Sequence, residues 1–163
     1  MHPPVTEVID RYRPDLPLEQ ACTPPAAWYV DPRFLELEQR TVFADSWQYA
    51  CRIDQVREPG EFVALELAGE PIVVVRGGDG VLRGFFNVCR HHAAAVVTEP
   101  AGCLKRLRCP YHGWTYTLEG ALKAAPAFEG VQDFDAADHG LVPVATATWD
   151  LLVVDEAHAA ASR

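Results

Sequence analysis

The sequence is short of positive charge and of long apolar runs, and both shortages exclude functions. Lys and Arg number 14 against 23 Asp and Glu, which gives a net charge of -9 at pH 7. A chain of this charge repels the phosphate backbone of nucleic acids. No stretch approaches the roughly 20 apolar residues that span a bilayer, and residues 1–10 lack the apolar core of a secretory signal. We therefore expect a cytoplasmic protein without nucleic-acid or membrane partners.

Cysteines are too few and too unevenly spaced for a disulfide framework. The sequence has five, and two of them, Cys89 and Cys109, stand in metal-ligand spacing with histidines. This usage is typical of a reducing compartment. The other three, Cys22, Cys51 and Cys103, are interpreted as buried or incidental thiols.

The distribution of proline predicts how the first third of the chain is organised. Prolines crowd residues 1–27, which predicts an extended arm over the surface. After this arm, Asp31 and Pro32 are the residue types preferred at a helix N-cap and at the first helical position. We expect a helix over about residues 32–46. Its inward stripe would be formed by Leu35, Val42, Phe43 and Trp47.

Short apolar segments separated by glycine-rich turns predict strands over the rest of the chain. The expected antiparallel meander comprises residues 61–67, 71–76 and 81–88, followed by a hairpin of 114–117 and 121–123. Residues 141–144 and 147–154 would close the sheet. With 163 residues the chain has room for one such domain, expected over 28–154, and for a tail over 155–163.

Two short loops carry the chemistry. Cys89-Arg90-His91 has the pattern C-x-H and Cys109-Pro110-Tyr111-His112 the pattern C-x-x-H, with seventeen residues between His91 and Cys109. A zinc finger would place both thiolates on one knuckle, whereas each loop here offers one sulfur and one imidazole. That division suits a two-iron cluster with unlike iron sites, in which the sulfurs hold one iron and the imidazoles the other.

The order and spacing of these four residues resemble the ligand signature of Rieske proteins. The surrounding segments 87–91 and 109–116 look like the Rieske domain of ring-hydroxylating oxygenase α subunits, and the similarity covers most of residues 28–154. It implies a mainly β, Rieske-type antiparallel fold with two ligand loops at one tip and an N-terminal helix. It also implies one [2Fe-2S] cluster on Cys89, His91, Cys109 and His112, with Arg90 and Trp114 around it.

Two neighbours of the ligands depart from that family's pattern. His92 occupies the place where the family commonly has arginine, so we interpret it as a surface residue or a neighbour of the ligands, and not as a ligand itself. The following Ala93-Ala94-Ala95 lacks the usual glycine. The extra cysteine pair and the serine of high-potential Rieske proteins are also missing, their places being held by Ala94, Tyr111 and Trp114. Fewer hydrogen bonds to sulfur predict a low potential, about -150 mV.

The resemblance implies an oxidoreductase, mono- or dioxygenase, whose catalytic iron is absent from this chain. That mononuclear Fe(II) would be bound by two histidines and a carboxylate, and His2, His92, His139 and His158 do not form such a motif. We expect this chain alone only to transfer electrons, from a reductase or ferredoxin to a mononuclear-iron domain or subunit, with a homotrimer expected for the full-length protein. Two alternatives stay open: a stand-alone Rieske ferredoxin-like carrier, and a zinc-stapled module without redox activity. Small Rieske ferredoxins generally lack the arm and helix, which favours the oxygenase.

Overall fold

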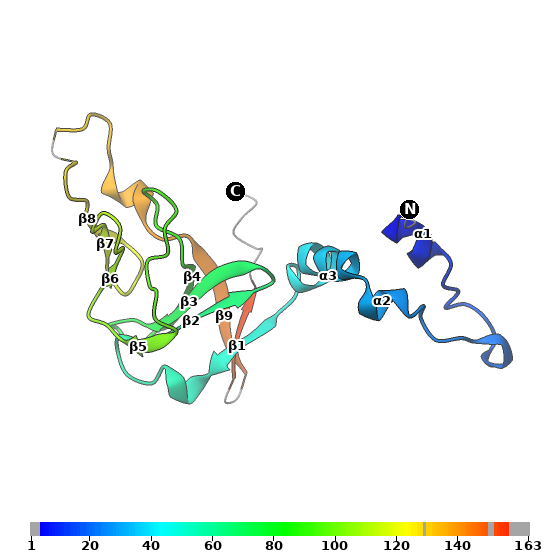
Figure 1. Ribbon diagram of the computed structural model, residues 1–163. Helices are drawn as coiled ribbons and strands as arrows, with labels where there is room; N and C mark the ends of the chain where they lie inside the picture. Colours follow the sequence, from blue (N-terminus) through cyan, green and yellow to red (C-terminus); the bar gives the residue numbers. More distant parts are fainter. Residues whose placement is uncertain (1–3, 129, 150–151, 157–163) are drawn as a thin grey trace.

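Antiparallel strands form the body of the protein in the computed structural model, which describes residues 4–128, 130–149 and, for the backbone, 152–156 (Figure 1). The larger sheet runs in the order β1 (Gln48–Arg52), β10 (Leu152–Glu156), β9 (Pro143–Trp149), β4 (Leu82–Phe86), β3 (Glu70–Arg76), β2 (Glu61–Leu67), β5 (Ala101–Cys103). The smaller sheet consists of β6 (Leu107–Arg108), β7 (Thr115–Tyr116) and β8 (Leu122–Ala124). Short 3-10 turns cover Leu18–Gln20, Ile53–Gln55 and Ala136–His139. The prediction of a mainly β, antiparallel fold is confirmed.

The expected meander is present as β2, β3 and β4, and its middle strand separates two cores. Val73 and Val75 of β3 pack into one core with Trp114 and Tyr116 of the small sheet. Ile72 and Val74 of the same strand pack into the other core, with Val56 among its members. Because successive side chains of a strand point to opposite faces, β3 is buried on both sides.

The N-terminal segment projects from the β body (Figure 1) and is more structured than expected. The extended-arm prediction for residues 1–27 is wrong at α1 (Val5–Asp10) and at the start of α2 (Ala27–Val30). An aromatic cluster that the proline pattern did not predict holds the segment together. The ring centroids of Tyr12 and Trp28 lie 5.2 Å apart, and those of Trp28 and Phe34 lie 5.9 Å apart. Val8 of α1 is buried as well.

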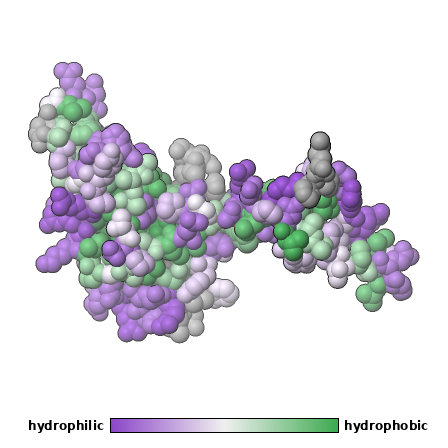
Figure 2. Space-filling view, viewed as in Figure 1, coloured by the Kyte–Doolittle hydropathy of each residue, from purple (hydrophilic) through white to green (hydrophobic). Residues whose placement is uncertain are grey.

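The helix expected after Asp31 exists, but with another buried face. α3 (Pro32–Glu38) begins with Asp31 as N-cap and continues as a π-helical turn over Gln39–Phe43, so it ends before residue 46. The predicted inward stripe is wrong at Leu35, Val42 and Trp47, which are 52%, 60% and 51% exposed. Its fourth member, Phe43, is half-buried, and Phe34 is buried instead. The helix packs through Phe34 on Trp28 instead of on the sheet. Figure 2 accordingly shows hydrophobic residues on the surface of the projecting segment.

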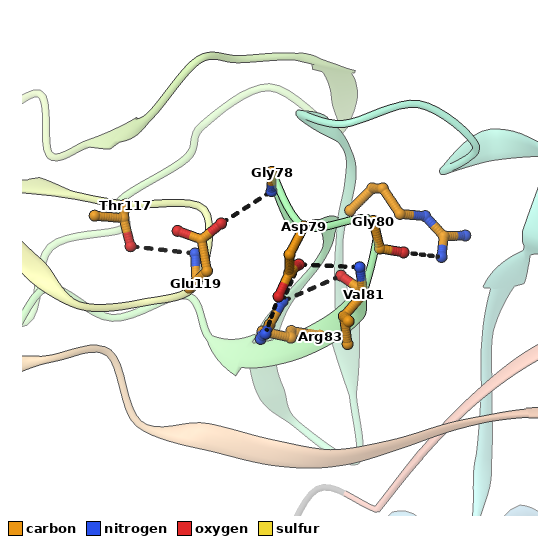
Figure 3. A network of polar contacts seen from close by, with 8 residues as sticks. Gly78, Asp79, Gly80, Val81, Arg83, Thr117 and Glu119 are labelled. Carbon is orange, nitrogen blue, oxygen red and sulfur yellow. Dashed lines mark hydrogen bonds and ion pairs between the residues drawn. The ribbon is translucent and has the colours of Figure 1, made fainter.

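The small sheet is fastened to the large one through the turn between β7 and β8. Glu119 accepts a hydrogen bond from the backbone N–H of Gly78, 2.9 Å away in the turn between β3 and β4 (Figure 3). Gly120 accepts one from Leu141 N–H at 2.8 Å. Gly120 has a φ of +88°, and a Cβ there would lie 2.4 Å from the ring of Phe85. Only glycine therefore allows this close approach.

The end of the expected domain also differs from the prediction. Asp155 and Glu156 belong to β10, so the tail expected over 155–163 does not include its first two residues. The rest of the expected tail, residues 157–163, lies outside the described residues.

Candidate metal centre

A buried asparagine holds the two ends of the first ligand loop. Asn87 follows β4, and its side-chain amide donates to the carbonyl of Val97 at 2.7 Å. Its side-chain oxygen accepts from the N–H groups of Val96 and Val97 at 3.1 and 2.9 Å. These hydrogen bonds join the residue before the loop to the residues after it. They also offset the cost of burying the polar amide of Asn87.

The two ligand loops have the same backbone frame. In the first, Cys89 N–H donates to Ala94 O at 2.8 Å and Ala93 N–H donates to Cys89 O at 3.0 Å. In the second, Cys109 N–H donates to Trp114 O at 2.8 Å and Gly113 N–H donates to Cys109 O at 3.1 Å. Each loop therefore turns back on its cysteine in the same way.

The loops bring the four predicted ligands to one end of the molecule. Cys89 and Cys109 are buried and belong to one core cluster, 3% and 2% exposed. His91 is half-buried and His112 exposed, and their ring centroids lie 4.8 Å apart. The sulfurs thus lie on the inner side of the site and the imidazoles on the side toward solvent.

Trp114 forms the floor below His91. The indole is 1% exposed and stacks parallel to the imidazole of His91, with centroids 4.9 Å apart and 2° between the planes. Phe128 and Phe134 contact Trp114 edge-on at 5.1 and 5.8 Å. These rings exclude water from the inner face of His91.

The chemistry of the donor set fits a bound metal group. Nδ1 of His91 is buried and has no hydrogen-bond partner among the residues that the structure describes. Partial burial lowers the pKa of His91, and repulsion from His92 and His112 lowers it further, so the neutral imidazole that binds metals is favoured. A buried nitrogen without a partner lowers the stability of the fold unless it binds a metal or accepts a hydrogen bond.

Tyr116 is a residue of the site that sequence reasoning missed. Its hydroxyl lies 3.3 Å from Cys89 Sγ and accepts a hydrogen bond from the backbone N–H of Arg90 at 3.0 Å. Burial raises the pKa of Tyr116, as does the hydrogen bond with Cys89, so the hydroxyl keeps its proton. Strand β7 places it two residues beyond Trp114, which is the only sequence signal that pointed to it.

His92 lies on the surface and directly beside a predicted ligand, which agrees with its interpretation from the sequence. It is exposed, but its ring centroid is 3.8 Å from that of His91. One ring nitrogen of each of His91, His92 and His112 lies within 4.8 Å of the others. The structure therefore places three imidazoles at the tip. Arg90, which was predicted to lie around the cluster, is exposed, and its contact with Tyr116 is made by its backbone N–H.

Comparison with known proteins agrees with this geometry. A family model described as Rieske [2Fe-2S] domain matches residues 46–135. The chain belongs to this family. The Rieske domain implies a [2Fe-2S] cluster, and the Rieske β fold expected from the sequence is confirmed.

This Rieske domain is similar to proteins that are named monooxygenases or oxygenase subunits. Choline monooxygenase of Arabidopsis thaliana is 37% identical over 159 residues, 98% of this chain and 37% of the relative. The oxygenase subunit of glycine betaine monooxygenase from Chromohalobacter salexigens is 40% identical over 121 residues, 74% of this chain and 27% of the relative. A crystal structure of a quaternary ammonium Rieske monooxygenase with L-carnitine superposes with a TM-score of 0.76 at 30% identity, covering 82% of this chain and 38% of the other.

This Rieske domain thus spans about a third of the length of these proteins. Among the described residues, no helix combines the length and the apolar character that crossing a bilayer requires.

Proposed function

We propose that this chain is the one-electron transfer module of a Rieske oxygenase α subunit, with the cluster held by Cys89, His91, Cys109 and His112. The observation that carries the proposal is the pair of equivalent loops, each presenting one buried sulfur and one imidazole. Nδ1 of His91 is buried and has no hydrogen-bond partner in the part of the chain that the structure describes. The two sulfurs would hold one iron and the two imidazoles the other. When bound, the cluster takes up and releases a single electron.

The surrounding residues have separate tasks in this proposal. Trp114 keeps water from the inner face of the site, because it is buried and stacked on His91. Tyr116 offers its hydroxyl proton to Cys89 Sγ, and a hydrogen bond to sulfur stabilises the extra negative charge of a reduced centre. His112 is the exposed one of the two proposed imidazole ligands, so an electron would leave the cluster through it.

We further propose that the electron goes to a mononuclear Fe(II) oxygenase site outside this chain, and that it comes from a reductase or ferredoxin. The names of the relatives, with choline, glycine betaine and carnitine among their substrates, support a quaternary ammonium compound over an aromatic ring. The match to choline monooxygenase covers 98% of the chain, which includes the N-terminal helices. This extent favours an oxygenase subunit over a stand-alone carrier.

The test is the spectrum of the purified chain together with its metal content. We expect two irons and two acid-labile sulfides per chain, visible absorption, and an electron paramagnetic resonance signal of Rieske type after reduction by dithionite. The midpoint potential is expected near -150 mV. Cys89→Ser should abolish the signal, whereas Cys22→Ser, at an exposed cysteine of the N-terminal segment, should retain it. A colourless protein holding one zinc would refute the proposal.

A further inference from the structure

Three imidazoles meet at the tip of the molecule, although the proposed cluster uses only two of them. His92 is exposed, and its ring centroid lies 3.8 Å from that of His91 and 5.4 Å from that of His112. One ring nitrogen from each of the three lies within 4.8 Å of the others. Since His92 stands where the family commonly has arginine, the third imidazole distinguishes this chain from the family pattern.

These three nitrogens are set apart from the two sulfurs of the site. Among the described residues, the metal-ligating atoms that lie this close together are the three imidazole nitrogens, and neither cysteine of the ligand loops belongs to the group. The proposed two-iron cluster accounts for the separation, because its sulfur ligands and its imidazole ligands bind different irons. A single metal ion at the outer side of the site therefore meets nitrogen donors only.

The three imidazoles need only small side-chain movements to bind one ion. Zn–N bonds of about 2.0–2.1 Å in a tetrahedral site place the nitrogens roughly 3.3–3.4 Å apart. His92 and His112 are exposed, so their rings can turn without disturbing the core, whereas His91 is held by its stacking on Trp114. Nδ1 of His91 has no hydrogen-bond partner among the described residues, so this nitrogen can bind an ion without breaking a hydrogen bond.

We propose that His91, His92 and His112 together bind one divalent transition-metal ion, such as Zn²⁺, in the chain that has not yet received its cluster. Three histidines with a water in the fourth position form an established type of open zinc site. Imidazole is also a ligand that suits Ni²⁺ and Cu²⁺. The net charge of -9 favours the approach of a cation to the exposed tip.

The ion and the cluster exclude each other, because both require His91 and His112. An ion held at the tip therefore delays cluster assembly, and His92 determines how strongly it does so. The ion binds without the thiolates and on the surface, so EDTA should remove it. This separates the site from a zinc-stapled module, in which the two cysteines would hold the metal. Binding of the ion does not depend on the proposed function, and only its competition with the cluster does.

The first experiment is a titration of the full chain, stripped of iron, with Co²⁺, whose absorption spectrum reports the donor atoms. We expect one Co²⁺ per chain, with the weak visible bands of nitrogen and oxygen ligands and without the intense near-ultraviolet band of a thiolate site. His92→Gln should weaken the binding of Co²⁺ and Zn²⁺ about tenfold or more, since even the partners of a metal ligand contribute about 10–100-fold to affinity. The matched control is His139→Gln, at a histidine outside the group, which should keep the affinity.

The second experiment follows assembly of the cluster from Fe²⁺ and sulfide in the presence of Zn²⁺. Zinc should slow assembly in the unchanged chain, and His92→Gln should need about tenfold more zinc for the same delay. A thiolate band with Co²⁺, no binding of Co²⁺, or equal behaviour of the unchanged chain and His92→Gln in either experiment would overturn the proposal. Binding of Co²⁺ as expected in a chain that forms no cluster even without zinc would instead refute the proposed function.

Discussion

Ala93 stands in the first ligand loop where Gly113 stands in the second. Each is the fourth residue after its cysteine, each donates its N–H to the carbonyl of that cysteine, and each has a positive φ, +55° for Ala93 and +76° for Gly113. The left-handed conformation costs an L-residue with a Cβ about 1–2 kcal/mol, whereas glycine adopts it freely. The first loop therefore carries strain that the second avoids.

Ala93→Gly should relieve this strain. We expect the free energy of unfolding to rise by about 0.5–1 kcal/mol, because the relief is partly offset by the greater freedom of glycine in the unfolded chain. Urea denaturation of the variant and the unchanged chain measures the difference. Ala94→Gly, at the next residue and without a positive φ, should lower stability. A destabilised Ala93→Gly would mean that the loop is not strained.

His92→Ala tests whether the third imidazole of the tip is a ligand. We expect the variant to keep its visible and paramagnetic spectrum, since each loop already supplies one sulfur and one imidazole without His92. His112→Ala is the matched change at a proposed ligand and should lose the spectrum. If His92→Ala also lost it while remaining folded by circular dichroism, the assignment of ligands would be wrong.

Tyr116→Phe should lower the midpoint potential of the centre. The change removes the hydroxyl 3.3 Å from Cys89 Sγ, and a hydrogen bond worth about 1–1.4 kcal/mol corresponds to a shift on the order of 40–60 mV for one electron. It also leaves the N–H of Arg90 without its acceptor, which should cost about 1–3 kcal/mol of stability. Protein-film voltammetry and denaturation measure the two effects. Tyr111→Phe, at an exposed tyrosine, is the control and should leave the potential unchanged.

Glu119→Gln should weaken the attachment of the small sheet to the large one in a pH-dependent manner. The Thr117 hydroxyl and then the backbone N–H of Gly78 hold the pKa of Glu119 below its usual range. Figure 3 shows the hydrogen bond from Gly78 to the carboxylate. The carboxylate therefore contributes stability above the unfolded pKa of about 4.3, and this contribution disappears as the pH falls through the folded value.

At pH 7 the loss in Glu119→Gln should be modest, about 0.5–1 kcal/mol, because the group is exposed. Denaturation at pH 7 and pH 3 provides the measurement. The free energy of unfolding of the variant should differ from that of the unchanged chain only at pH 7. Glu66→Gln, at an exposed residue of β2, should show no such difference between the two pH values.

The sequence predicted the parts of the molecule that local rules determine. Glycine-rich turns and alternating apolar residues located β2, β3 and β4, and the Asp31-Pro32 pair located the start of α3. The ligand spacing led to two loops that the structure indeed brings to one end. These signals lie within a few residues of one another along the chain.

Features that depend on distant contacts escaped prediction. The helical spacing of Leu35 and Val42 indicated a buried stripe, but the face of α3 that is covered depends on Trp28, which packs on Phe34. The role of Tyr116 depends on the first loop lying against the small sheet, a contact across 27 residues. The local sequence pattern of neither segment indicates these tertiary contacts.

The burial of β3 on both faces bears on how the molecule opens. Residues Ile72 to Val75 are fully buried, and β3 is hydrogen-bonded along both edges, to β2 and to β4. Local fluctuations that expose loops and edge strands do not free amides in such a position. The backbone protons of β3 should therefore exchange with deuterated solvent only when the two cores come apart together, which makes this strand the slowest-exchanging reporter of global unfolding.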